Sequence, residues 1–79
     1  MKRIEEPVEV EDRKGWPVRI QRGTRVYRVQ KLVDVWVVQG HWWLEEEKRV
    51  YFRVLTDKGV MDVYRRDKNG EWVMAKLAD

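Results

Sequence analysis

The 79-residue sequence contains no cysteine and no serine, and it has a single histidine, His41. The absence of cysteine excludes a disulfide scaffold and a cysteine-based zinc site, and it fits a reducing compartment. The commonest catalytic nucleophiles are also missing, which leaves the hydroxyls of Thr24 and Thr56 with one histidine to activate them. We therefore expect a protein that is not an enzyme and that uses no cofactor or metal.

Long apolar segments are missing as well. No apolar run is longer than four residues, and a run such as Val35 to Val38 is far too short to cross a bilayer. The first residues are polar, so we expect no signal peptide, no membrane contact and a cytoplasmic location. Asparagine occurs once, at Asn69, while 39% of the residues are charged. Few amides and many charges of both signs are typical of heat-adapted proteins.

Apolar and polar residues alternate with a period of two, which is the pattern of half-buried β-strands. Val8 and Val10 alternate with glutamates, and Val50, Phe52 and Val54 alternate with Tyr51 and Arg53. Glycines and other turn formers separate these runs. The sequence thus predicts six strands over residues 6–12, 17–22, 25–38, 48–57, 60–67 and 71–78.

The third predicted strand is too long to remain flat, and its inward-facing parity changes near Gln30–Leu32. A bulge or bend there would let it cross from one sheet to another. We expect one all-β domain over residues 1–79, with residues 1–5 and 78–79 frayed. Its architecture is a small antiparallel barrel or a strongly curved sheet of about six strands joined by hairpins.

The expected turns specify the strand registers. A Gly23–Thr24 loop places Ile20 opposite Tyr27, Arg19 opposite Arg28 and Arg22 opposite Arg25. A Lys58–Gly59 loop places Val54 opposite Val63 and Thr56 opposite Met61. A three-residue loop at 68–70 places Val63 opposite Ala75 and Met61 opposite Leu77. One face is then a core, composed of Val50, Phe52, Val54, Met61, Val63, Val73, Ala75 and Leu77.

The net charge of +3 is mild, but the charges are unevenly distributed. Residues 1–12 contain two bases and five acids. Residues 13–31 contain no acid and seven bases, Arg13, Lys14, Arg19, Arg22, Arg25, Arg28 and Lys31. Such a stretch is either a nucleic-acid footprint or a strand neutralised by the acidic first strand beside it. At the hairpin tip, Arg22 and Arg25 have no acidic neighbour in sequence, which favours an anion such as phosphate there.

The face opposite the expected core contains Tyr51, Arg53, Leu55, Tyr64, Trp72 and Met74. A single-stranded nucleic acid could stack its bases on Tyr64 and Trp72 while Arg53, Arg65 or Arg66 contacted phosphates. The alternative is that this face packs against the N-terminal strands or against a second copy of the chain, since exposed apolar patches are rare on monomers.

Several segments carry a resemblance over nearly the whole chain. In order, they are Glu6-Pro7-Val8-Glu9-Val10, Arg22-Gly23, Tyr27-Arg28-Val29, Trp36, Trp42-Trp43, Tyr51-Phe52-Arg53-Val54, and Tyr64-Arg65 ahead of Trp72. This arrangement resembles a family of short bacterial proteins known only as a domain of unknown function. The resemblance implies a setting near Y-family, error-prone DNA polymerases and hence DNA repair. It transfers no catalytic residue, and this chain has Ile20-Gln21 where family members tend to have a tryptophan.

The leading hypothesis is a small binding module for nucleic acid, preferably single-stranded, or for a protein associated with a DNA polymerase. Its expected contact residues are Arg19, Arg22, Arg25, Arg28, Arg53, Tyr64, Arg66 and Trp72. The alternative is a protein–protein adaptor or homodimer that uses the face of Tyr51, Tyr64, Trp72 and Met74.

Overall fold

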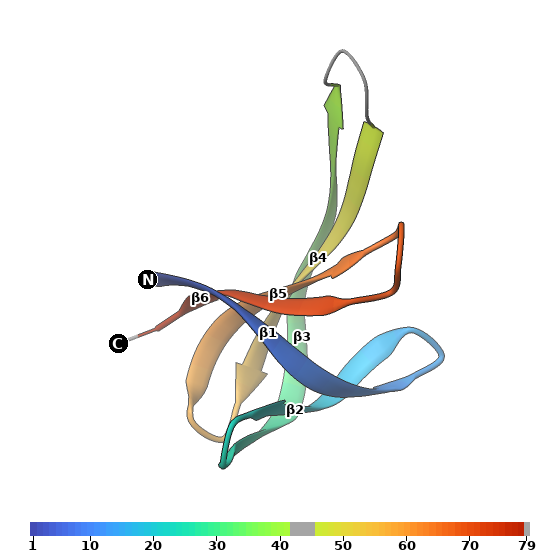
Figure 1. The fold of residues 1–79 in the computed structure, drawn as a ribbon. Helices are drawn as coiled ribbons and strands as arrows, with labels where there is room; N and C mark the ends of the chain where they lie inside the picture. Colours follow the sequence, from blue (N-terminus) through green and yellow to red (C-terminus); the bar gives the residue numbers. More distant parts are fainter. Residues whose placement is uncertain (42–45, 79) are drawn as a thin grey trace.

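The structure is a computed structural model that describes residues 1–41 and 46–78. Six antiparallel strands follow one another along the chain and form a closed barrel in sequence order (Figure 1). They are β1 (Lys2–Arg13), β2 (Trp16–Arg22), β3 (Arg25–His41), β4 (Glu46–Thr56), β5 (Gly59–Arg66) and β6 (Trp72–Leu77). The all-β barrel expected from the sequence is confirmed. Trp42, Trp43 and Asp79 lie outside the described residues.

The barrel closes because the first strand pairs with the last. Lys2 is opposite Leu77 and Arg3 is opposite Lys76, so strand structure begins four residues earlier than the sequence pattern predicts. Residues 2–5, which we expected to be frayed, therefore belong to the β1–β6 ladder. After β6, the backbone N–H of Ala78 still donates to the carbonyl oxygen of Val60 at 2.9 Å.

The long strand β3 changes partners where a bend was expected. Its first part pairs with β2 as far as Arg28, and its remainder pairs with β4. Register shifts fall between Val29 and Lys31 and between Leu32 and Asp34. Extra residues of this kind bend a strand and increase its twist. The bend predicted at residues 30–32 is confirmed, and it lets one strand belong to both sides of the barrel.

The β2–β3 hairpin has the predicted register, with Arg22 opposite Arg25 and Ile20 opposite Tyr27. The β4–β5 hairpin differs. Its loop is Asp57–Lys58, so Val54 is opposite Met61 rather than Val63. The Thr56 hydroxyl specifies this turn, because it donates to the Gly59 carbonyl oxygen at 2.8 Å and accepts from the Lys58 N–H at 3.1 Å. The predicted register was wrong by two residues, which leaves every side chain on its expected face.

The β5–β6 pair contains an irregularity that changes the faces. Met61 is opposite Leu77 as predicted, but Val63 is opposite Met74 instead of Ala75. A bulge adds one residue to β6 at this point, and a one-residue shift sends side chains to the other face of the sheet. The predicted placement of Val73 and Ala75 in the core, with Trp72 and Met74 outside, was therefore wrong.

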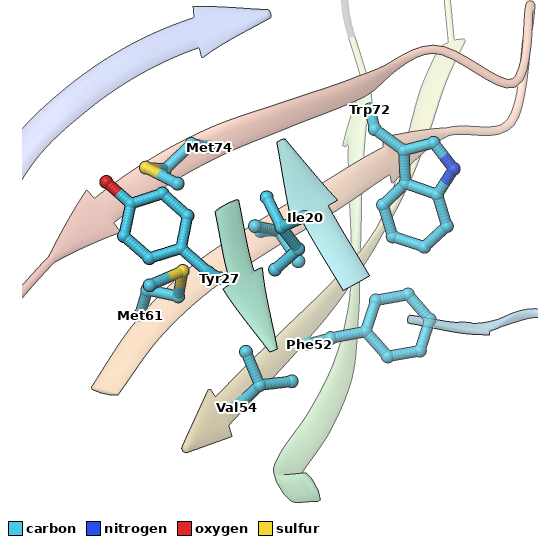
Figure 2. Close-up of a cluster of buried hydrophobic side chains, with 8 residues drawn as sticks. Ile20, Tyr27, Phe52, Val54, Met61, Trp72 and Met74 are labelled. Carbon is cyan, nitrogen blue, oxygen red and sulfur yellow. The ribbon is translucent and has the colours of Figure 1, made fainter. Parts of the chain in front are cut away.

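The barrel interior is filled by eight buried residues from five strands, most of them shown in Figure 2: Ile20, Tyr27, Phe52, Val54, Met61, Val63, Trp72 and Met74. Phe52 and Trp72 contact each other with ring centroids 5.4 Å apart. The ring of Trp16 meets Phe52 edge-on at 5.9 Å, although Trp16 is 48% exposed. Burial of these large side chains is the main stabilising contribution in so small a domain.

A second apolar cluster covers the outside of the sheet. Tyr64, Val73 and Ala75 are buried there, and Tyr51 packs against them. Tyr51 lies between two other rings, 4.9 Å from Tyr64 and 5.3 Å from Trp36 by ring centroids. This outer cluster explains why β5 and β6 are buried on both faces, whereas β1 is largely exposed.

The β3–β4 hairpin extends beyond the barrel as an arm, seen as the green and yellow ribbon that leaves the ring in Figure 1. We define the arm as residues 34–41 of β3 with 46–53 of β4, which pair without irregularity.

No helix in the described residues is long and apolar enough to cross a membrane.

Candidate nucleic-acid interface

The seven bases of residues 13–31 lie at the end of β1 (Arg13), in the turn that follows (Lys14), on β2 and on β3. Arg22 is half-buried, and the other six are exposed. Among the described residues, Arg22 is the one member of this group whose side chain lies within 4.0 Å of a carboxylate, since Glu6 Oε2 lies 2.8 Å from its Nε. The Asp57 carboxylate also lies beside Arg28, but it accepts from the backbone N–H of Arg28, at 3.0 Å. The other six are Arg13, Lys14, Arg19, Arg25, Arg28 and Lys31. An acidic residue of the first strand therefore neutralises one of these seven bases, Arg22.

Arg19 and Arg28 are directly opposite each other on the outer face of β2 and β3. Their neighbours Ile20 and Tyr27 point into the core, which fixes the arginines outside. Glu11 is opposite Arg19 on the other side, yet its carboxylate makes no ion pair with it within 4.0 Å. Two like charges opposite each other are unfavourable, and a bound anion would offset that repulsion.

Lys31 extends this basic face along β3. The irregularity between Val29 and Lys31 places Lys31 opposite Leu55 of β4, and its side chain is exposed. A strictly alternating strand would have given residue 31 the inward parity of Val29. The sequence pattern therefore did not single out Lys31, because its position depends on the bulge. We call Arg19, Arg28 and Lys31 the basic strip.

The hairpin tip is a separate place, at one end of the barrel. Arg22 donates to Glu6 through Nε at 2.8 Å and through Nη2 at 3.1 Å. This bond from Arg22 lowers the pKa of the Glu6 carboxyl and raises the pKa of Arg22. The prediction of a tip without an acidic neighbour was wrong, because barrel folding brings Glu6 there from β1. Arg25 remains exposed beside a shallow depression lined by Glu6, Arg22, Gly23, Thr24 and Arg25.

Arg53 and Arg66 are both held by carboxylates. Arg53 binds Asp62 through two hydrogen bonds, of 2.8 and 3.0 Å, and its guanidinium lies 5.5 Å from the Trp36 ring centroid. Hydrogen bonding to Asp62 raises the pKa of Arg53. The Arg66 Nε lies 3.6 Å from a Glu47 oxygen that also accepts from Arg49 at 3.2 Å. Neither arginine lies on the basic strip.

Tyr64 and Trp72 do not form a common stacking surface. Trp72 is in the barrel core, and Tyr64 is in the outer cluster on the opposite face of the sheet. Both rings are buried, at 8% and 1% exposure. The Tyr64 hydroxyl donates to Glu5 at 3.0 Å, and the Arg49 guanidinium covers its ring at 4.7 Å. Burial is the main cause that raises the pKa of Tyr64.

These placements correct two predictions. Base stacking on Tyr64 and Trp72 was wrong, because neither ring offers an open face. The alternative interface of Tyr51, Tyr64, Trp72 and Met74 was wrong as well, because Trp72 and Met74 belong to the core. The expectation that this face packs within the chain holds for Tyr51 and Tyr64, which lie in the outer cluster. The bulge in β6 is the cause in each case.

The described residues contain no group of three or more histidine, aspartate or glutamate side chains arranged to hold a metal ion. No protein-family model, no curated protein and no solved structure matches the chain. The resemblance to bacterial proteins of unknown function therefore stays an expectation.

Proposed function

We propose that this chain is a non-enzymatic binding module that contacts the phosphates of a nucleic acid through the basic strip. The observation that supports this is the position of three exposed cations, Arg19, Arg28 and Lys31, on one outer face, with no side-chain ion pair to any residue that the structure describes. Arginine and lysine side chains placed in this way bind phosphate oxygens, and counterions are released when they do.

The preference for single strands loses its basis, because it depended on stacking against Tyr64 and Trp72. Contacts to phosphate alone carry no sequence information and act on single and double strands alike. We therefore propose a sequence-independent, salt-sensitive contact. Among the threonine hydroxyls, that of Thr56 is engaged in the β4–β5 turn, which fits a binding role rather than nucleophilic catalysis.

The test is a titration of fluorescent single- and double-stranded DNA and RNA with the purified protein at several salt concentrations. For three phosphate contacts, the slope of log K against log salt should be about −2 on single strands. The variant Arg19→Glu/Arg28→Glu should weaken binding by at least tenfold at low salt. Binding that does not change with salt would contradict the proposal.

A charge-matched control separates the basic strip from net charge. Lys68 and Lys76 are exposed lysines on the β5–β6 side of the barrel, and neither makes an ion pair within 4.0 Å with residues 1–41 or 46–78. Lys68→Glu/Lys76→Glu changes the net charge by the same amount as the arginine double variant. If both variants lose affinity equally, the contact is a general effect of charge and the basic strip is not a site.

A protein partner with an acidic surface, such as a protein associated with a DNA polymerase, is the second candidate. The same exposed cations favour it, because charge complementarity steers protein association as well. We also propose that the protein is cytoplasmic and heat-adapted. Binding to an acidic protein that persists after nuclease treatment, together with no affinity for DNA or RNA, would favour this candidate over the first.

A further inference from the structure

Apolar side chains are exposed mainly on one stretch of β3. Seven large apolar residues of the described chain are exposed, and five of them lie between residues 32 and 38. They are Leu32, Val33, Val35, Val37 and Val38, with Val37 the most exposed at 54%. The register places Leu32, Val35 and Val37 on the inner face and Val38 on the outer face, so this stretch exposes apolar side chains on both faces. Exposed apolar side chains gathered on one strand mark an interaction site.

The same stretch has an open backbone edge. β2 pairs with β3 only as far as Arg28, and β4 occupies one side of the arm. Within the described residues, no strand pairs with the other side of β3 from Asp34 onward. Strands protect such an edge with lysine, proline or a bulge, but residues 35–40 contain none of these.

The direction of the edge groups follows from one hydrogen bond. The Val35 N–H donates to the Asp34 Oδ1 at 2.8 Å, so it does not donate to a carbonyl of β4. Backbone groups of successive residues in a regular strand point to opposite sides, and pairing is regular from Asp34 onward. The N–H and C=O of Val37 therefore also point toward the open edge.

We propose that a second copy of this chain pairs antiparallel along this edge, with the two-fold axis at Val37. The two copies then form a continuous sheet in the order β5, β4, β3, β3, β4 and β5 at the axis, because Val50, the partner of Val37, also pairs with Arg65 of β5. Val37 of one copy exchanges backbone hydrogen bonds with Val37 of the other. On the outer face, Trp36 of each copy lies opposite Val38 of its partner.

Two properties of the edge point to a second copy rather than to another protein. A two-fold axis requires a surface that is complementary to itself, and an antiparallel strand edge meets this requirement by geometry. Residues 35–40 carry no charge, so the two copies oppose no like charges along the pair. Asp34, the nearest charge on β3, would lie opposite Gly40 of the partner. The contact is confined to one short strand edge of each copy, which buries less area than a standard interface, so the dimer should depend on concentration.

The test uses two opposite charges at the axis. In sedimentation velocity over a range of concentrations, the wild-type chain should associate from monomer to dimer. Val37→Lys and Val37→Glu should each be monomeric, because identical charges would meet at the axis. An equimolar mixture of the two variants should restore the dimer, because lysine then faces glutamate. Restoration by mixing distinguishes self-pairing from a variant that is merely damaged.

Val33→Lys is the matched control, because Val33 is 51% exposed but lies at the irregularity outside the paired stretch. It should retain the dimer. A wild-type chain that stays monomeric at millimolar concentration would overturn the proposal, as would a dimer unaffected by Val37→Lys. The Arg19→Glu/Arg28→Glu variant should dimerise normally, so failure of the nucleic-acid proposal and failure of this one are separately visible.

Discussion

Strands β3 and β4 run through both the barrel and the arm, but a valine on them is buried in the barrel and exposed in the arm. Val54 and Val37 lie on the same face of the β3–β4 hairpin, but Val54 is fully buried and Val37 is 54% exposed. Around Val54, the other strands of the barrel close over this face. Val37 instead lies where β3 has left its pairing with β2, so β3 is an edge strand there and has β4 on one side alone in the part of the chain that the structure describes. Burial of a valine therefore depends on the strands that close around the hairpin and not on the pairing within it.

The largest expected change in stability comes from replacing each of these valines by aspartate. Val54→Asp places a carboxylate in the core without a partner, which costs several kcal/mol out of a total stability of about 5–15 kcal/mol. We expect no cooperative thermal transition for this variant by circular dichroism. The free energy of unfolding of Val37→Asp should lie within about 0.5 kcal/mol of the wild-type value. Equal loss of structure in both would mean that the arm packs as the barrel does.

A smaller effect comes from comparing two tryptophans. Trp72 is buried against Phe52 in the barrel, and its truncation to alanine should cost about 3–5 kcal/mol. Trp36 lies on the outer face of the arm, stacked on Tyr51 and half-buried, so Trp36→Ala should cost less than half as much. Urea denaturation of both variants measures the difference. A larger loss for Trp36 would make the outer cluster the main core.

The two threonines offer a third comparison, because Thr56 is buried at the end of β4 and Thr24 is exposed in the β2–β3 turn. The buried Thr56 hydroxyl makes two hydrogen bonds that fix the β4–β5 turn. Thr56→Val should destabilise the chain by about 1–3 kcal/mol. Thr24→Val, at the exposed tip of the β2–β3 hairpin, should change stability by less than about 0.5 kcal/mol. Both follow from urea midpoints at a constant m-value.

The smallest expected effect concerns pH. Arg22 lowers the pKa of the Glu6 carboxyl below its ordinary value of 4.5. A lowered pKa in the folded state means that the pair stabilises the barrel above that ordinary value and that this stability is lost as the pH falls through the lowered one. Glu6→Gln should therefore flatten the fall in melting temperature between neutral and acidic pH. Glu9→Gln is the control and should leave the profile unchanged, because Glu9 lies on the same exposed strand and makes no ion pair within 4.0 Å in the described part of the chain.

Much of the barrel could be predicted from alternation and turn residues. The β2–β3 register and the bend near Gln30 follow from a glycine turn and from a change of parity within one strand. The β4–β5 register was missed because a threonine hydroxyl, rather than the glycine, selects the turn. That error was harmless, since a shift of two residues keeps the faces.

The candidate site was less predictable, because it depends on irregularities whose exact positions the sequence did not give. The change of parity near Gln30 indicated a bend in β3 but not which side chain it turns outward, and nothing in the sequence indicated the bulge in β6. The bulge in β6 moves Trp72 into the core and separates it from Tyr64, which removes the expected stacking surface. The bulge in β3 moves Lys31 onto the basic strip. The Arg22–Glu6 pair joins strands that are adjacent only after the chain folds, so acid-free sequence around Arg22 did not mean an unpaired side chain.

The pairing of Lys2 with Leu77 has a consequence for how the chain folds. Each of the other five ladders joins consecutive strands, so it closes a loop that is shorter than the barrel. The β1–β6 ladder joins strands from opposite ends of the described chain, and its loop-closure entropy is the largest of the six. Hairpins should therefore form first and the ring should close last, giving the millisecond-to-second folding typical of β-proteins with distant contacts. A chain emerging from the ribosome cannot complete the ring until its final strand is available.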